Sequence, residues 1–442
     1  MGWLCMSEMD SVTSTELGEL PAHWPVQRFD SLFAVQQGKQ VSRTNRIGEN
    51  QRPFLRTKNV FWGAVDLSDL DEMHFTEAEE KRLALHPGDL LVCEGGDIGR
   101  TAIWNDTLPR CYYQNHLHRA RLRDKGAADS QFALYWLWYA FEIGSVYFGR
   151  GNVTTIPTLS QSKLCELPLP VPPLLEQRKI AGVLGVVQRA MEQQERLLAL
   201  TAELKKALLH QLFTAGLRGE PQKETEIGLV PESWEVGPLA TLFYTQLGKM
   251  LSQKARKGGD PKPYLRNKNV QWGAIDTTDL LSMGFNERER GKFILVPGDL
   301  LICEGGEPGR AAIWHGDVKE CYYQKALHRL RPKSENASNE FLAYWLEFAL
   351  RYQDLYGVAG ASSTIAHLPE VQLKMLQLPQ PSRAEQDEIV ECLSAADKKM
   401  VFHQSKYVAL TALFRTLLHQ LMTAQLRVHD LDLPELEQLT RD

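Results

Sequence analysis

The sequence lacks several features that would assign it to a class directly. No apolar run approaches the roughly 18–20 residues that a membrane-spanning helix needs, and the start, MGWLCMSEMD, has neither the basic flank nor the apolar segment of a secretion signal. The G-x-x-x-x-G-K-[ST] phosphate loop, the H-E-x-x-H zinc helix and the G-x-S-x-G nucleophile elbow are also missing. These absences predict a cytoplasmic protein with no membrane partner and no chemistry of its own.

Cysteine is sparse and shows no metal-binding or disulfide pattern. Seven cysteines are scattered over 442 residues without a C-x-x-C pair, which argues against a disulfide framework and a zinc ribbon. Four of them recur in equivalent positions and are expected to be buried, reduced thiols: Cys93 with Cys303, and Cys111 with Cys321. A metal site of Cys111, His116 and His118 is the alternative, but the second copy carries Ala326 in place of the first histidine.

Charge of one sign is not in excess. The net charge is −5, with 24% charged and 43% hydrophobic residues, which is typical of a soluble globular protein of roughly two to four domains. This balance does not predict nucleic-acid binding, although a global sum can hide a basic face. Whether the chain has a basic face that could bind nucleic acid therefore depends on where the charges lie along the sequence.

The chain is a tandem duplication. PGDLLVCEGGDIGRTAIW at 87–104 returns as PGDLLICEGGEPGRAAIW at 297–314, with 14 of 18 positions identical. LRTKNVFWGAVD at 55–66 returns at 265–276 with 9 of 12 identical, and CYYQNHLHR at 111–119 returns at 321–329 with 7 of 9 identical. The period is too long for a solenoid, so the repeated unit is a domain followed by a helix.

Each half begins with a predicted α+β domain. DLLVCE, GGDIG and RTAIW predict a strand, a turn and a second strand, and residues 129–142 and 337–350 predict a helix with a broad apolar face. EGGDIG differs from a G-x-G-x-x-G loop, and Asp97 (Glu307 in the copy) would oppose an anion there. We expect a tight strand connection in which glycine supplies positive φ.

Each half ends with a predicted long helix, 176–215 and 385–424, whose apolar residues follow three-and-four spacing. We expect these helices to pack on each other as an antiparallel coiled coil with pseudo-two-fold symmetry; the alternative is that each folds back onto its own domain. The apolar positions are Ile180, Leu184, Val187, Met191, Leu198, Leu204, Leu208 and Leu212, and then Ile389, Leu393, Ala396, Met400, Tyr407, Leu413, Leu417 and Leu421.

The complete division predicted from the sequence has seven parts. They are an N-terminal arm (1–20), a first α+β domain (21–175), the first helix (176–215), a linker (216–230), a second α+β domain (231–384), the second helix (385–424) and a C-terminal tail (425–442).

Basic and polar residues gather in corresponding loops of the two domains. Lysine and arginine reach phosphates, whereas asparagine, glutamine and arginine read base edges, so this mixture predicts DNA contacts; solvated loop charge is the alternative. The candidates in the first half are Lys39, Arg43, Arg46, Arg56, Lys58, Asn59, Arg100, Gln114, Asn115, His116, Arg150 and Thr154. The candidates in the second half are Lys249, Lys254, Arg256, Lys257, Arg266, Lys268, Asn269, Arg310, Gln324, Lys325 and Ser363.

Aromatic residues at repeat positions have apolar neighbours, and we interpret them as core rather than as platforms for base stacking. They are Tyr113, Tyr323, Trp62, Trp104, Trp272 and Trp314.

The chain has two α+β domains that alternate with two similar helices, and it contains, in this order, PGDLLVCEGG, YYQNHLHR and LPLPVPPLLEQRKIAGVL. It resembles the DNA-specificity subunit of type I restriction-modification systems. The resemblance covers about residues 16–423. Its most specific part is the proline-rich segment that leads into Glu176–Gln177 and Glu385–Gln386. PQPSRAEQDEI at the second helix departs from PVPPLLEQRKI at the first.

The resemblance implies that each domain recognises one half of a split target in double-stranded DNA. The helices would fix the spacing and, through the apolar positions Ile180, Leu184, Met191, Leu198, Leu208, Ile389, Leu393, Met400, Tyr407 and Leu417, dock two methyltransferase subunits. Restriction-translocase subunits would join for cleavage. S-adenosylmethionine, ATP and Mg²⁺ would bind to those partners and no cofactor to this chain. A stand-alone two-headed regulator, or an enzyme with a hidden site, are the alternatives.

The similarity between the halves adds a hypothesis. Domains that recognise unrelated half-sites are expected to diverge, but these share long blocks, so we expect a gapped, near-palindromic target.

Overall fold

The computed structural model describes residues 11–105, 107–147, 158–251, 260–356 and 367–431. The chain forms two compact units, the first containing residues up to Gln194 together with those from Lys406 onwards, and the second containing Glu195–Ser405. Each unit holds one α+β domain. Two long helices, α7 (Leu174–Thr214) and α13 (Arg383–Met422), each contribute one half to each unit.

Two sheets form the body of the first domain. A four-stranded antiparallel sheet has the order β10-β9-β12-β4, and a three-stranded sheet has the order β11-β5-β8. The elements of the four-stranded sheet are β4 (Phe33–Gln37), β9 (Leu90–Cys93), β10 (Thr101–Ile103) and β12 (Leu117–Leu122), and those of the other are β5 (Gln51–Leu55), β8 (Asp71–His74) and β11 (Tyr112–Tyr113).

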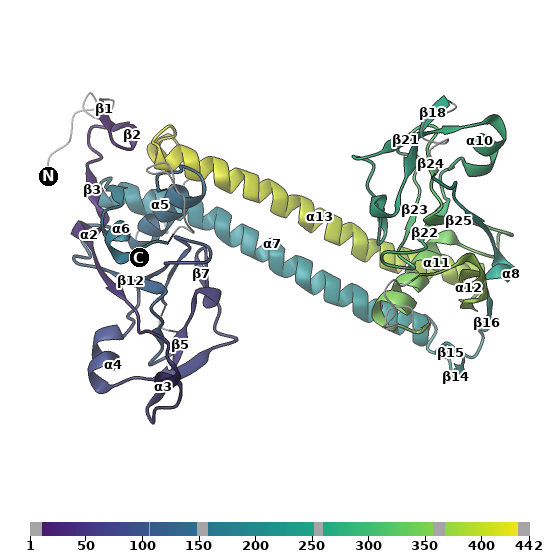
Figure 1. The fold of residues 1–442 in the computed structure, drawn as a ribbon, viewed down its shortest axis with the longest axis horizontal. Helices are drawn as coiled ribbons and strands as arrows, with labels where there is room; N and C mark the ends of the chain where they lie inside the picture. Colours follow the sequence, from purple (N-terminus) through teal and green to yellow (C-terminus); the bar gives the residue numbers. More distant parts are fainter. Residues whose placement is uncertain (1–10, 106, 148–157, 252–259, 357–366, 432–442) are drawn as a thin grey trace. The chain divides into compact units, whose positions relative to one another are not determined.

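Short elements complete the first unit. The strands are β1 (Val12–Thr15), β2 (Gly18–Pro21), β3 (Val26–Arg28), β6 (Val60–Phe61), β7 (Ala64–Val65) and β13 (Pro168–Pro170). The helices are α2 (Phe29–Leu32), α3 (Arg43–Arg46), η1 (Thr57–Asn59), α4 (Glu77–Leu83), α5 (Ser130–Glu142), α6 (Gln161–Cys165) and η5 (Val428–Asp430). Figure 1 shows α3 and α4 at the end of this unit that lies away from α5.

The second domain repeats the first strand for strand. Its sheets have the orders β17-β25-β22-β23 and β21-β18-β24. Their strands are β17 (Phe243–Leu247), β18 (Asp260–Leu265), β21 (Leu281–Phe285), β22 (Leu300–Cys303), β23 (Ala311–Ile313), β24 (Tyr322–Tyr323) and β25 (Leu327–Pro332). The duplication seen in the sequence is therefore a duplication of topology.

The remaining elements of the second unit also have counterparts in the first. The strands are β14 (Gln222–Thr225), β15 (Gly228–Pro231), β16 (Glu235–Pro238), β19 (Val270–Gln271), β20 (Ala274–Ile275) and β26 (Gln377–Gln380). The helices are α8 (Leu239–Leu242), η3 (Asn267–Asn269), α10 (Glu287–Phe293), α11 (Asn339–Leu346), the π-helical turn η4 (Glu347–Tyr352) and α12 (Glu370–Met375). The helix predicted at 337–350 thus changes to π-helical geometry after Leu346.

Both faces of the four-stranded sheet are buried, which explains the continuous apolar run DLLVC. Side chains alternate along a strand: Leu90 and Val92 of β9 pack with α5 and the long helices, whereas Leu91 and Cys93 pack towards the three-stranded sheet. Leu300, Ile302, Leu301 and Cys303 repeat this division in β22. The four repeated cysteines are buried, as predicted, and burial raises the pKa of Cys93 and Cys303 to about 11.

The glycine-rich segment between β9 and β10 is a tight turn, as predicted. Gly96 and Gly99 have φ of 76° and 80°, values that favour glycine. A Cβ at Gly99 would lie 2.2 Å from the ring of Phe141 in α5, and one at Gly309 would lie 2.1 Å from Leu350. Glycine at these two positions therefore lets the turn pack against the helix.

The glutamate–glutamine pair at the start of each long helix ties that helix to its domain. Gln177 accepts a hydrogen bond from the Asp129 backbone N–H at 2.9 Å and donates to the Pro172 carbonyl at 2.7 Å. Gln386 makes the equivalent bonds to Ser338 and Pro381, each at 3.0 Å. The indoles of Trp24 and Trp234 donate to Glu176 and Glu385. These hydrogen bonds explain why glutamate and glutamine occur together at the start of both long helices.

The long helices pack antiparallel, as predicted. In the first unit the beginning of α7 shares a core with the end of α13, through Ile180, Leu184, Phe414 and Leu418. In the second unit the end of α7 shares a core with the beginning of α13, through residues that include Leu209 and Leu393. Each helix therefore packs both on its own domain and on the domain of the other half. The helices begin two residues earlier than predicted and end one or two residues earlier.

The predicted apolar stripe is only partly buried. Ile180, Leu184, Ile389 and Leu393 are buried in the cores of the two units, so their prediction as docking positions is corrected, whereas Met191, Leu198, Leu208, Met400, Tyr407 and Leu417 are half-buried. Leu204 and Leu413 are exposed, so their assignment to the stripe was wrong; Lys205 and Phe414 are buried instead. A repeat of 3.5 residues drifts by ~20° per heptad around a straight α-helix. The buried face has therefore moved by one position, from Leu204 to Lys205 and from Leu413 to Phe414.

Candidate nucleic-acid interface

Two of the predicted DNA-contacting lysines are internal supports. Lys39 is 8% exposed, and its ammonium donates to Glu79 at 2.6 Å and to the His74 carbonyl at 2.8 Å. Lys249 makes the equivalent bonds to Glu289 at 2.7 Å and to the Gly284 carbonyl at 2.6 Å. Their assignment as DNA contacts is corrected, because both charges are already neutralised inside the domain.

The repeated asparagines cap a turn rather than face solvent. Asn59 is buried, accepts a hydrogen bond from the Arg56 backbone and donates to the carbonyls of Asp66 and Asp69. Asn269 makes the same set of bonds in the second domain. Neither amide is available to a base edge, and this prediction is also corrected.

The basic residues beside those asparagines pair with nearby carboxylates. Arg56 binds Asp71 and Lys58 binds Asp69. In the second domain both Arg266 and Lys268 bind Asp279. The side chain of Lys58 is partly exposed and that of Lys268 is largely exposed, so their pairs are weak and salt-sensitive.

Arg100 and Arg310 hold the glycine-rich turn in place. Arg100 donates to Asp97 at 2.6 Å and to the Thr57 carbonyl at 2.8 Å, and it lies over the ring of Phe61. Arg310 donates to Glu307 and to the Asn267 carbonyl. Both side chains are mostly buried, so their assignment as DNA contacts is corrected to a structural role.

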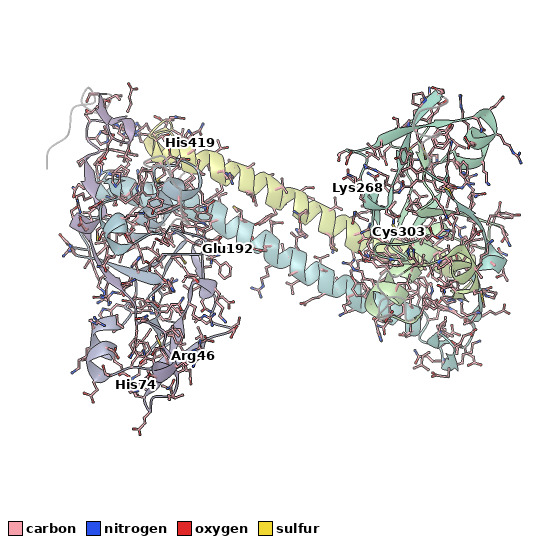
Figure 2. All side chains as sticks on the ribbon, viewed as in Figure 1. Arg46, His74, Glu192, Lys268, Cys303 and His419 are labelled. Carbon is pink, nitrogen blue, oxygen red and sulfur yellow. The ribbon has the colours of Figure 1, made fainter. Side chains whose placement is uncertain are left out.

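The candidates that stay accessible lie at a few places on the domain surface. Arg43 and Arg46 are exposed on α3, which Ser42 caps by accepting from the Asn45 backbone. Arg46 approaches Asp71 only at 4.0 Å, and Figure 2 shows it near His74 at the end of the unit that carries α3.

A second accessible place follows the repeated tyrosine pair. In the first domain Asn115 is half-buried and His116 is exposed. In the second domain Gln324 is half-buried and Lys325 is exposed. Gln114 is buried in the first domain, so its assignment as a base reader is corrected.

Some predicted contacts lie outside the described residues. They are Arg150, Thr154, Lys254, Arg256, Lys257 and Ser363.

The repeated aromatic residues belong to the protein interior. Tyr113, Tyr323, Trp104 and Trp314 are buried, as predicted. Trp62 and Trp272 are half-buried against the cores, and Trp62 stacks on Trp138 at 5.1 Å.

The residues of the alternative metal site do not converge. His118 is buried with its Nε2 2.8 Å from the Leu159 carbonyl, whereas His116 is exposed and lies 3.8 Å from Glu94. Among the residues that the structure describes, no three His, Cys, Asp or Glu side chains gather as a metal ion would need. His118 and its counterpart His328 instead anchor the segments around Leu159 and Leu368.

These two histidines predict a pH dependence of stability. Burial lowers the pKa of both below 6.5, and each Nδ1 is buried without a partner. The unfolded imidazoles therefore bind protons that the folded ones do not, so the free energy of unfolding falls as pH drops below about 6.5. Each histidine contributes up to about 1.4 kcal/mol per pH unit in this window. Urea unfolding between about pH 7 and pH 5.5 measures the slope.

The matched control is the His118→Gln/His328→Gln variant. Glutamine can donate to the same carbonyls but does not titrate, so a shallower pH slope is expected. An unchanged slope would show that other groups control the pH dependence.

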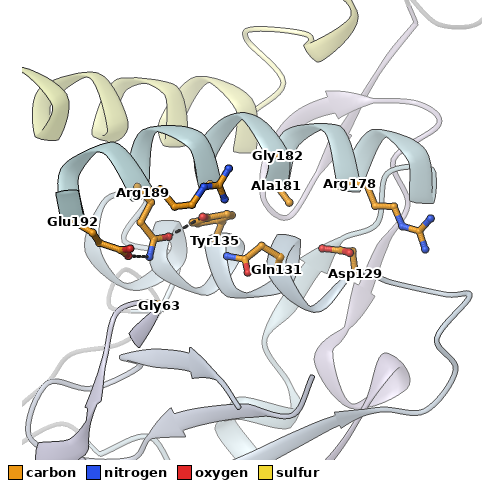
Figure 3. A pocket seen from close by; sticks show the side chains of 11 residues that line it. Gly63, Asp129, Gln131, Tyr135, Arg178, Ala181, Gly182, Arg189 and Glu192 are labelled. Carbon is orange, nitrogen blue, oxygen red and sulfur yellow. Dashed lines mark hydrogen bonds between the residues drawn. The ribbon is translucent and has the colours of Figure 1, made fainter. Parts of the chain in front are cut away.

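The structure also contains a groove that was not predicted from the sequence. It has a volume of about 590 Å³ and lies in the first unit between α5, the β6–β7 turn and α7 (Figure 3). Its floor on α7 is built from Ala181, Gly182 and Gly185, and Arg178 and Arg189 border it. Two glycines inside a helix are unfavourable by about 1 kcal/mol each relative to alanine, and this was the signal available in the sequence.

The groove has a lining that is both polar and apolar, and its residues on α7 are not repeated in α13. Tyr135 of α5 reaches across to Gln188 at 2.7 Å, and Gln188 donates to Glu192 at 2.8 Å. At the corresponding positions α13 carries Asp387, Glu391 and Ser394 in place of Arg178, Gly182 and Gly185. Arg178 and Arg189 share the lining of the groove with the carboxylates of Asp129 and Glu192, so the groove carries charges of both signs.

The fold defines a class of protein: a tandem pair of α+β domains of one topology, with two long helices that each contribute to both units. The family model for the type I restriction modification DNA specificity domain matches residues 21–202 and 231–412, one copy in each half. The chain therefore belongs to the type I restriction-modification DNA specificity family. As a member it is a non-catalytic DNA-recognition component.

Relatives of the same kind match along the chain. The type I restriction enzyme MjaVIII specificity subunit of Methanocaldococcus jannaschii is 22% identical over 430 residues, covering 93% of this chain and 95% of that protein. The EcoKI specificity subunit of Escherichia coli is 23% identical over 305 residues, covering 64% of this chain and 62% of that protein.

Solved structures share the fold. The type I restriction-modification S subunit from M. genitalium matches with a TM-score of 0.56 and 18% identity, covering 90% of this chain and 96% of that chain. A chain from a study of complex assembly in the type I R-M system matches with a TM-score of 0.54 and 16% identity, covering 92% and 99%. No described helix is long and apolar enough to cross a membrane.

Proposed function

We propose that this chain recognises a split DNA target, one half with each α+β domain, on behalf of a type I restriction-modification complex. The observation that carries the proposal is the repeated topology: the sheet order β10-β9-β12-β4 of the first domain recurs as β23-β22-β25-β17 in the second. Two equivalent recognition domains suit a target with two separated parts. Because α7 and α13 each belong to both units, their length is suited to setting the unread gap.

The accessible polar sets are proposed to approach the DNA. Arg43 and Arg46 carry charges suited to phosphates, and Asn115 and Gln324 carry amides suited to base edges. The candidates beyond the described residues remain predictions. The internal residues, such as Lys39, support these surfaces from within the domain.

The long helices are proposed to dock two methyltransferase subunits, with restriction subunits joining the complex in the cytoplasm. Apolar side chains exposed on them support this role. They are Leu175, Val186, Leu200 and Leu204 on α7, and Val401, Phe402, Val408 and Leu413 on α13. S-adenosylmethionine, ATP and Mg²⁺ are proposed to bind to the partner subunits.

A gapped, near-palindromic target is expected, because the two domains share both their sequence blocks and their topology. Differences between the loops at 40–51 and 251–260 would create any asymmetry. Sequencing of methylated sites in a host that carries the system measures the two half-sites directly. Half-sites with unrelated sequences would contradict the near-palindrome, and a single continuous site would contradict the split target.

Purification of the tagged chain from that host distinguishes the proposal from a stand-alone regulator. A methyltransferase subunit is expected to accompany the chain in stoichiometric amount. Recovery of the chain alone, with tight specific DNA binding, would favour the regulator.

A further inference from the structure

The two places where a helix end from one half meets the domain of the other half have different chemistry. In the first unit the end of α13 lies against α5; in the second unit the end of α7 lies against α11 and η4. We call these the first and second crossing. Equivalent positions are 209 residues apart in the sequence. Both crossings keep a buried leucine, Leu418 and Leu209, and a tyrosine, Tyr135 and Tyr344.

The first crossing is aromatic. Phe414 is 2% exposed, and its ring lies 4.7 Å from that of Trp138 and 6.0 Å from that of Tyr135. The Tyr135 hydroxyl donates to the amide oxygen of Gln188 at 2.7 Å. The two rings that contact Phe414 carry no charge, and the amide of Gln188 also donates to the Glu192 carboxylate at 2.8 Å.

The second crossing is ionic. Lys205 is 8% exposed, and its ammonium lies 2.8 Å from Glu347 and 2.8 Å from Asp397. Tyr344 donates to Asp397 at 2.7 Å, and Arg351 also binds Glu347, at 3.0 Å. Burial alone would lower the pKa of Lys205, but the two carboxylates outweigh it and raise that pKa.

The differences between the crossings coincide at three equivalent positions. Phe414 corresponds to Lys205, Trp138 to Glu347, and Gln188 to Asp397. In each crossing the first residue comes from one half of the chain and the other two come from the opposite half. We infer that these six residues form a pairing code that directs each helix end to the domain of the unlike half and rejects the same half of a second copy.

The physical reason is the partner that each side chain would lose. If two first halves paired, Lys205 would meet Trp138 and Gln188 in place of Glu347 and Asp397, and the Glu192 carboxylate beside them already accepts a hydrogen bond from Gln188 at 2.8 Å. If two second halves paired, Phe414 would cover Glu347 and Asp397, which would keep Arg351 and the Tyr344 hydroxyl respectively but would both lose Lys205. A buried charge without its partner strongly destabilises the assembly, so unlike pairing is favoured at both crossings. A duplicated chain needs such a device because its two halves otherwise present nearly the same surfaces.

Full-length variants reproduce each mismatch inside one chain. Phe414→Lys places a lysine at the first crossing, as the pairing of two first halves would. Lys205→Phe places a phenylalanine at the second crossing, as the pairing of two second halves would. Each is expected to lower the folding equilibrium constant by about 100-fold, measured by urea unfolding. Arg43→Lys, on the exposed α3, is the control and is expected to leave this constant unchanged.

The complementary changes are expected to restore pairing. Phe414→Lys with Trp138→Glu and Gln188→Asp gives the first crossing the ionic set, and Lys205→Phe with Glu347→Trp and Asp397→Gln gives the second the aromatic set. Each triple variant is expected to recover most of the loss of its single variant. Single variants as stable as the parent chain, or triple variants no more stable than the singles, would overturn the code. If one triple variant misfolds, the other still decides between these outcomes.

Discussion

Lengthening α7 and α13 together by four residues is expected to abolish methylation of the original target and create methylation at a target with the same halves and a longer gap. Four helical residues add ~6 Å, which corresponds to roughly one to two base pairs at 3.4 Å each. The insertions belong after Leu197 and after Lys406, which are equivalent positions near the boundary between the units. Methylation sequencing reads the old and new gaps in one experiment.

Both helices must be lengthened because they pack on each other in each unit. An insertion in α7 alone, placed before Lys205, changes the register between the two crossings to which α7 contributes, including the contact between Lys205 and Asp397. This single insertion is the control, and it is expected to reduce stability and methylation of every target. If the doubly lengthened chain still methylates the original gap, the helices do not set the spacing.

Replacing Arg43 and Arg46 together by alanine is expected to weaken DNA binding about 10-fold or more and to flatten its salt dependence. Each lost phosphate contact lowers the slope of log K against log salt by about 0.9, so two contacts lower it by about 1.8. Both side chains are exposed on the short helix α3, so the fold is expected to persist. Titration of the assembled complex with target DNA at several salt concentrations measures the slope.

The matched control removes the same charge elsewhere on the domain. Arg28 and Lys163 are exposed near α2 and α6, away from α3 (Figure 1), and Arg28→Ala/Lys163→Ala is expected to leave the slope unchanged. Equal slopes for both double variants would exclude α3 from the interface.

Much of the architecture was predictable from the sequence because it depends on short-range patterns. The repeated blocks predicted two domains of one topology, and strand alternation with glycine turns predicted β9, its turn and β10. The proline pair followed by Glu176 and Gln177 predicted the start of α7 within two residues. Periodicity predicted antiparallel long helices, since an apolar stripe requires a partner.

The candidate interface was predicted less well, and the errors have one cause. Lys39, Asn59 and Arg100 lie in loops of basic and polar composition, which is typical of both a binding surface and an internal support. What decides between them is a partner 7 to 43 residues away, such as Glu79 or the carbonyls of Asp66 and Thr57. Composition does not reveal such partners.

The sequence by itself therefore determined the duplication, the fold class and the family resemblance, because these depend on repeated motifs and local periodicity. Only the tertiary structure decided which basic side chains are free, which face of each long helix is buried, and that Lys205 and Phe414 occupy equivalent crossings. The physical reason is that burial and charge neutralisation depend on which segments meet in space. In this chain, the segments that meet at each crossing come from opposite halves.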